Sequence, residues 1–174
     1  MRVLQYLWFH FVSLATAWLP DLRPVLQLRG FLLRPSFQSC GKNLQVARRA
    51  TVNFTNRMQI GDDVFLGMGC WLHAAGGIIL EDEVQIGPYA MLITGDHTQI
   101  DGSYRFGPPD LAPIRIGCGA WIAAHATVTK GVRVGRGALL AANSVATHEI
   151  PAYSSAGGVP AQPIERKARI EVVR

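Results

Sequence analysis

His97 is the side chain whose type and position best suit acid–base chemistry, and it lies in the segment TGDHTQIDG, residues 94–102. An imidazole with an ordinary pKa titrates near neutral pH, so it can take the proton of a hydroxyl group while that oxygen attacks an electrophile. The segment separates two regular regions of the chain, and function concentrates on loops that a rigid scaffold holds. The sequence therefore predicts His97 as a general base, against the alternative of a solvated loop histidine.

Two aspartates, Asp96 and Asp101, flank this histidine. Either carboxylate could hydrogen-bond the imidazole or the hydroxyls of a substrate, and either could instead cap the loop. The pair Asp101-Gly102 is a turn signal in itself, so we favour the turn for Asp101 and leave both interpretations open for Asp96.

The remaining histidines are weaker candidates. His73, in the segment WLHAAGG, is the second choice because it is predicted to face outward and could line a substrate cleft. His125 is predicted to be a surface residue, and His148 is either a plain exposed corner or a neighbour of a bound phosphate. His10 belongs to the apolar start of the chain.

Composition limits the class of protein. The 174 residues are 49% apolar and 17% charged, which indicates one ordered domain with a core. The net charge of +5 favours acidic partners such as phosphate groups or an anionic membrane face. No nucleic-acid-binding motif is present, so we expect no nucleic-acid partner. The three distant cysteines fit neither a disulfide framework nor a zinc site and indicate a reducing, cytoplasmic compartment.

The first 35 residues differ from the rest. The stretch VLQYLWFHFVSLATAWL, residues 3–19, is almost entirely apolar and is as long as the shortest segments that span a bilayer. It could be a signal peptide with a cleavage site at Ala15-Thr16-Ala17, a transmembrane anchor, or a helix packed on its own domain or oligomer. We favour a helix at the membrane surface, with Arg23, Arg29 and Arg34 meeting lipid phosphates.

A six-residue repeat organises most of the remaining chain. From Ile116 six consecutive hexads follow one another: IGCGAW, IAAHAT, VTKGVR, VGRGAL, LAANSV and ATHEIP. The same frame begins at Ile60 and at Ile86, and Val46 and Val52 open weaker hexads. A period of six is neither that of an amphipathic helix nor that of an alternating strand, and it predicts a solenoid of short parallel strands.

Each hexad position has an expected role. The aliphatic first residue points into the core, and the small fifth residue suits a tight corner. Glycine or alanine is common at the second position, where glycine is expected to permit backbone angles that other residues resist.

These hexads resemble those of the hexapeptide-repeat acyltransferases, over roughly residues 40–164. The segment GAWIAAHATV resembles a tryptophan-containing hexad of that family, AGGVPAQPI resembles its ending, and TGDHTQIDGS resembles its active-site loop. The resemblance implies a mainly β fold, a left-handed parallel β-helix over residues 39–153 with an extended loop at 94–113. An apolar, basic helical segment (1–38) precedes the β-helix, and a C-terminal segment and tail (154–174) follow it.

The resemblance also implies a donor and a set of binding residues. The donor is acetyl-CoA, with no metal, and its pantetheine arm lies beside small side chains while the backbone amide of Ala124 meets the thioester oxygen. The residues implied in acetyl-CoA binding are Ala124, Ala142, Thr147, Gly158, Pro160, Ala161, Arg166 and Lys167. Candidates for acceptor binding are His73, Asp96 and Trp121.

We therefore predict an acetyl-CoA-dependent O-acetyltransferase acting on a sugar hydroxyl of a surface polysaccharide or its lipid-linked precursor. Relatives are trimers with sites between neighbouring solenoids, which implies a homotrimer. Residues 1–35 would contact the inner face of the cytoplasmic membrane, so we expect a cytoplasmic, peripheral protein.

Other functions stay open. They are acetylation of a hydroxylated antibiotic or other xenobiotic, and N-acetylation of an amino sugar. A metal hydratase similar to the γ-class carbonic anhydrases is disfavoured because His97 lacks histidine partners at the required spacing. A non-catalytic scaffold is disfavoured because the base and the family ending are both present.

Overall fold

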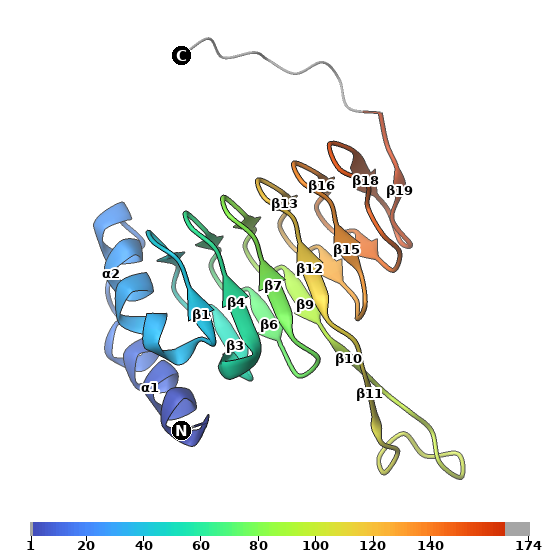
Figure 1. The fold of residues 1–174 in the computed structure, drawn as a ribbon, viewed down its shortest axis with the longest axis horizontal. Helices are drawn as coiled ribbons and strands as arrows, with labels where there is room; N and C mark the ends of the chain where they lie inside the picture. Colours follow the sequence, from blue (N-terminus) through green and yellow to red (C-terminus); the bar gives the residue numbers. More distant parts are fainter. Residues whose placement is uncertain (1, 166–174) are drawn as a thin grey trace.

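A computed structural model describes residues 2–165 and shows two helices followed by a parallel β-solenoid (Figure 1). The helices α1 (Arg2–Ala15) and α2 (Arg23–Leu33) lead through a 3-10 turn, η1 (Arg34–Ser36), into the first coil. The fold class expected from the hexads, a parallel β-helix behind an apolar helical segment and with one extended loop, is confirmed.

Each coil of the solenoid contributes short strands to three sheets, here called sheets A, B and C. Sheet A contains β1 (Ser39–Cys40), β4 (Met58–Ile60), β7 (Ile78–Leu80), β12 (Ile114–Ile116) and β15 (Arg133–Val134). Sheet B contains β2 (Gln45–Val46), β5 (Phe65–Leu66), β8 (Gln85–Ile86), β13 (Trp121–Ile122), β16 (Leu139–Leu140), β18 (Ser155–Gly157) and β19 (Gln162–Pro163). Sheet C contains β3 (Thr51–Asn53), β6 (Trp71–His73), β9 (Met91–Ile93), β14 (Thr127–Val128) and β17 (Val145–Ala146).

Hexad positions one and five both fill the core. Leu66 and Ile86, at first positions, pair in register between β5 and β8 and are fully buried. Cys70 and Ala120, at fifth positions, are equally buried. The fifth residue is therefore small chiefly because it shares the narrow interior with the first residue of the next hexad.

The role expected for second-position glycines is wrong. Gly67 and Gly87 have no left-handed backbone, and a Cβ atom on Gly67 would lie 2.6 Å from the carbonyl oxygen of Ile86 in the next coil. Left-handed backbone occurs instead at the fourth position, for example at Gly119 and His125. Second-position glycine is needed because the coils approach closely there, and the turn itself is made two residues later.

The two helices cover the first coil of the solenoid (Figure 1). Phe9 and Val12 of α1 and Leu33 of α2 are buried in the same apolar cluster as the first strands, and Phe9 meets Phe37 edge to face. This contact shields the end of the coil stack from water, which every β-solenoid requires at its terminal repeats.

A buried arginine fixes this helical cover. The guanidinium of Arg29, only 3% exposed, donates hydrogen bonds to Asp21 Oδ1 (2.6 Å) and to the carbonyl oxygen of Leu19 (2.6 Å). Asp21 Oδ1 also accepts from the backbone amide of Arg48 in the first coil. Burial raises the pKa of the Asp21 carboxyl, but the hydrogen bonds from Arg29 and Arg48 outweigh it and lower that pKa overall. Among the described residues, no helix is both long and apolar enough to cross a membrane.

Candidate active site

The interruption of the repeat occurs at one corner of the solenoid, where the chain passes from sheet C to sheet A. Three successive coils carry extra residues there: the 3-10 turn η2 (Thr55–Arg57) after β3, the turn 74–77 after β6, and residues 94–113 after β9. The later coil from β14 to β15 has no insertion, since Val128 and Val134 stand six residues apart. The insertions therefore line one edge of the molecule.

Thr94 is the point at which the longest insertion leaves the coil. Its side chain is buried, its Oγ1 donates to the carbonyl oxygen of His73 (2.7 Å), and the same Oγ1 accepts from the amide of Gly76 (2.8 Å). At the other end of the insertion, Ala112 donates its amide to the carbonyl oxygen of Thr94 (3.1 Å). Both ends of the insertion are thus fixed to each other and to the preceding corner.

The insertion is an antiparallel hairpin that projects away from the solenoid (Figure 1). Its strands are β10 (Gly95–His97) and β11 (Pro109–Leu111), with His97 opposite Pro109. His97 is exposed, so its imidazole is accessible to a substrate. Asp101 and Gly102 both have positive φ, between Ile100 and Ser103, as in a two-residue hairpin turn. The turn interpretation of Asp101 is confirmed.

Lys130 ties the root of the hairpin to the next coil. Its ammonium group contacts Asp96 Oδ2 at 3.1 Å and donates a hydrogen bond to Asp110, which lies opposite Asp96 in the hairpin. The hydrogen bond to Asp110 raises the pKa of Lys130, and Asp96 adds to this rise. The carboxylate of Asp96 is therefore engaged by Lys130, while its role in acceptor binding stays a prediction.

His73 lies on β6 close to the same corner. Its half-buried ring meets Phe54 edge to face at a centroid distance of 5.2 Å and Trp71 at 6.2 Å, and its Nδ1 has no partner among the described residues. In sheet C it pairs with Ile93, four residues before His97. His73 and His97 therefore belong to one edge, as an acceptor cleft would require.

Trp121 lies elsewhere. It is exposed on sheet B, where it pairs with Gln85 and helps to line a pocket of about 430 Å³ together with Phe65. Because His97 leaves the corner between sheets C and A, the solenoid core separates it from Trp121 within one chain. A single chain does not bring these two predicted site residues together.

Most residues implied in acetyl-CoA binding follow the corner between sheets B and C. Ala124 and Ala142 occupy this corner in consecutive coils, and Asn143 donates its amide to the carbonyl oxygen of Ala124 (3.1 Å). The turn holding Gly158, Pro160 and Ala161 continues the same edge, and the amide of Ala161 donates to the carbonyl oxygen of Val145 (2.8 Å).

The other implied residues are separate from this edge. Thr147 lies past β17, toward the next corner, and its Oγ1 is 2.9 Å from Nδ1 of His148. Arg166 and Lys167 lie outside the described residues. Within the described part of the chain, no group of three or more His, Cys, Asp or Glu side chains could hold a metal ion.

Sequence reasoning missed Thr94 and Lys130 as supports of the hairpin. Lys130 is 34 positions from Asp96, and a coil-to-coil contact of this kind leaves no spacing signal in one sequence. Thr94 is a third hexad residue, for which the sequence predicts no inward side chain, so only its place at the start of the interruption could have drawn attention to it.

The comparisons with known proteins agree with this geometry. The family model "Hexapeptide repeat of succinyl-transferase" matches residues 58–87 and 113–148. WcaF of Escherichia coli (strain K12), a proposed acetyltransferase of colanic acid biosynthesis, is 27% identical over 95% of this chain and 88% of its own length. These matches confirm the resemblance drawn from the hexads.

Solved structures share the fold. The hexapeptide-repeat acetyltransferase VCA0836 from Vibrio cholerae, complexed with acetyl coenzyme A, superposes with a TM-score of 0.78 at 24% identity, covering 93% of this chain and 86% of that one. A maltose O-acetyltransferase from Clostridium difficile 630 gives a TM-score of 0.81 at 24% identity, covering 97% and 89%.

The contact of Lys130 with two hairpin carboxylates predicts a specific effect on local motion. In Lys130→Met the hairpin loses its tie to the next coil, so we expect amide exchange in residues 95–111 to become up to about fivefold faster, as for loss of an exposed ion pair. Hydrogen exchange with mass spectrometry measures this. Lys130→Arg, which keeps the charge, is the control, and unchanged protection in Lys130→Met would show that the hairpin is held by other contacts.

Proposed function

Because the chain resembles the hexapeptide-repeat acetyltransferases, we propose that it transfers acetyl from acetyl-CoA to a sugar hydroxyl, with His97 as the base. The observation that carries this proposal is the suspension of an otherwise regular solenoid at one corner to project an exposed histidine. In the proposed reaction His97 takes the proton of the acceptor hydroxyl while the hydroxyl oxygen attacks the carbonyl carbon of the thioester. The C–S bond then breaks, and the CoA sulfur leaves with the proton that His97 returns.

The similar proteins support a carbohydrate as the acceptor. The similarity to WcaF supports a polysaccharide or its lipid-linked precursor, and the structural similarity to a maltose O-acetyltransferase supports a sugar hydroxyl. Acetyl-CoA as the donor is supported by the complex of VCA0836 and by the small-residue edge at Ala124 and Ala142, which lets an extended arm approach the backbone.

The base assignment can be tested directly. His97→Ala should lower kcat by about 100- to 10,000-fold, the range typical of general-base catalysis, with little change in the KM for acetyl-CoA. The assay is mass spectrometry of candidate glycans incubated with acetyl-CoA. Asp101→Asn is the matched control, because asparagine also suits the positive φ of that turn. Undiminished product with His97→Ala would refute the assignment, and acetylation of antibiotics but of no glycan would favour a xenobiotic acetyltransferase.

We further propose a homotrimer in which the hairpin of one solenoid reaches sheet B of its neighbour. The support is geometric: His97 is exposed on a projecting hairpin, whereas Trp121 and its pocket lie on another face of the same solenoid. A neighbouring copy would place the base of one chain against the pocket of the next, completing a site that one chain lacks.

Subunit mixing tests this arrangement. His97→Ala and Trp121→Ala should each be nearly inactive alone, whereas trimers reassembled from an equal mixture should regain about a quarter of the wild-type activity, since random assembly restores both side chains at that fraction of interfaces. Mixing each variant with itself is the control. Absence of any recovery in verified mixed trimers would place both residues in the same chain's site.

The exposed side of α1 supports a peripheral contact with an anionic membrane face. Phe9 and Val12 face the solenoid, but the opposite side of the helix presents further apolar side chains. These are Leu4, Leu7, Phe11 and Leu14, continued beyond the helix by Trp18, and Leu14 and Trp18 are 77% and 79% exposed. Arg23 and Arg34 are exposed as expected, but Arg29, which was also expected to meet lipid phosphates, is buried against Asp21. Apolar side chains at helical spacing beside basic residues favour lipid headgroups over water.

Vesicle sedimentation tests the membrane contact. Leu7→Ser combined with Leu14→Ser should reduce binding to phosphatidylglycerol-containing vesicles by about tenfold or more, because two apolar side chains no longer enter the lipid. Tyr153→Ser, at a distant exposed aromatic, should bind like wild type. Unreduced vesicle binding by the double variant would exclude this face, and a change of oligomeric state instead would assign it to a contact between copies.

A further inference from the structure

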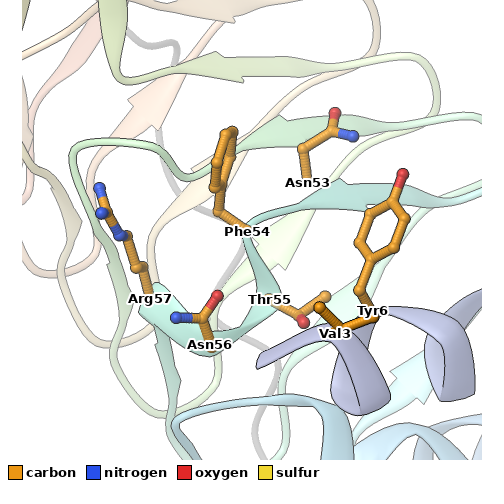
Figure 2. Close-up of a pocket in the computed structure, with 7 residues that line it drawn as sticks. All are labelled: Val3, Tyr6, Asn53, Phe54, Thr55, Asn56 and Arg57. Carbon is orange, nitrogen blue, oxygen red and sulfur yellow. The ribbon is translucent and has the colours of Figure 1, made fainter. Parts of the chain in front are cut away.

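A second pocket lies at the same edge as His97, between α1 and the 3-10 turn η2. Its volume is about 460 Å³, and it is lined by Val3, Tyr6, Asn53, Phe54, Thr55, Asn56 and Arg57. Figure 2 shows Tyr6 and Asn53 on one side of the Phe54 ring and Arg57 on the other. The pocket therefore combines two aromatic rings with amide, phenol and guanidinium groups.

Phe54 is an unusual residue for an exposed corner. Its backbone is left-handed (φ 59°), although it is neither glycine nor asparagine, and 44% of its side chain is exposed. A bulky residue in this conformation costs free energy, and exposing an aromatic ring adds to the cost. The guanidinium of Arg57 lies 5.8 Å from the ring centroid, and the edge of His73 supports the ring from the neighbouring coil. The ring is thus fixed in place with one part open to solvent.

The polar groups around the ring are also positioned. The indole N–H of Trp71 donates to Asn53 Oδ1 at 2.7 Å, which fixes the amide so that its NH₂ group remains for other partners. Arg57 donates to the carbonyl oxygen of Ala75, which holds its long side chain across the corner. A fixed aromatic face beside fixed hydrogen-bonding groups suits a sugar ring, whose C–H face packs on aromatics while its hydroxyls bond amides and guanidinium groups.

The position of the pocket relates it to His97. Asn53, His73 and Ile93 are in register across β3, β6 and β9, so Asn53 lies about two strand spacings, roughly 10 Å, from Ile93 at the root of the hairpin. His97 lies four residues beyond Ile93 along the hairpin, so an acceptor that reaches both His97 and the pocket must span more than one coil, as a short chain of linked sugars can. The two sites share one edge of the solenoid, with the turn 74–77 of the intervening coil between them (Figure 1).

We propose that this pocket is a second glycan-binding subsite, which holds a sugar ring of the acceptor chain other than the ring that is acetylated. The acceptor is then an oligosaccharide or a longer glycan, and a single sugar uses only part of the site. This proposal rests on the proposed function, because it takes the acceptor to be a carbohydrate. It assigns Phe54 as the central contact, with Tyr6, Asn53 and Arg57 around it.

The test is binding without acetyl-CoA, so that it does not depend on catalysis. The full chain is applied to an array of bacterial polysaccharide fragments graded in length from single sugars to oligosaccharides. Wild-type protein should bind the longer fragments more tightly than single sugars. Phe54→Asn, which suits the left-handed backbone but removes the ring, should weaken binding of the longer fragments by roughly 3- to 10-fold, as expected for one aromatic contact, and leave single sugars unaffected. Tyr153→Asn is the matched control, since Tyr153 is also an exposed aromatic with positive φ (59°) on another corner.

The outcomes separate this proposal from the proposed function. Binding that does not depend on fragment length, no binding to any fragment, or equal binding by Phe54→Asn would overturn the subsite. A change in the sedimentation coefficient of Phe54→Asn would also overturn it and assign the pocket to a contact between copies. If wild-type protein binds long fragments through Phe54 but acetylates no glycan, the subsite stands and the proposed function fails.

Discussion

The structure depends on the close stacking of one coil on the next. Backbone hydrogen bonds join every coil to its neighbours at the spacing of adjacent β-strands, and at Gly67 the coils lie so close that no side chain would fit between them. Inside the coils, Leu66, Ile86 and similar residues fill a narrow and mostly apolar interior. A reactive side chain can therefore stand only on an outer face or on an insertion at a corner.

The corner between sheets C and A is where this protein departs from the repeat. An insertion there costs little, because the strands on both sides keep their partners while the extra residues extend into solvent. Thr94 satisfies the polar groups that the departure would otherwise leave buried, and Lys130 ties the hairpin to a later coil. His97 is consequently carried on an element whose root is ordered although its tip is exposed.

Much of the fold could be predicted because the repeat is a local pattern. The inward first position, the interruption at residues 94–113 and the turn at Asp101 all follow from residue types at fixed spacing, and the structure has each of them. Special backbone angles were the reason expected from the sequence for glycine at the second hexad position. In the structure this glycine is required because the next coil leaves no room for a Cβ atom. Contacts across coils, such as Asp96 with Lys130, join residues far apart in the sequence and leave no local pattern.

Part of the candidate site was predictable and part was not. His97 is a candidate because it stands where the hexads fail, whereas the pocket around Phe54 needs the packing of α1 against a corner of the first coil, which no periodicity reveals. Ala124 and Ala142 share one corner in consecutive coils, whereas Thr147 lies toward another corner, because hexad position alone does not say which of the three corners a residue occupies.

The N-terminal helix α1 both covers the end of the solenoid and lines the pocket beside Phe54. Phe9 and Val12 seal the open end of the solenoid, while Val3 and Tyr6 on the same helix line the pocket beside Phe54. A β-solenoid must cover its terminal coil, so this helix would be required even without a ligand. Since the insertions of the first coils lie along the same edge as His97, a helix placed there can also form one wall of the proposed subsite for an extended acceptor. With the proposed membrane contact, the apolar outer side of the same helix would lie against lipid, and the pocket beside Phe54 would then open close to the membrane surface.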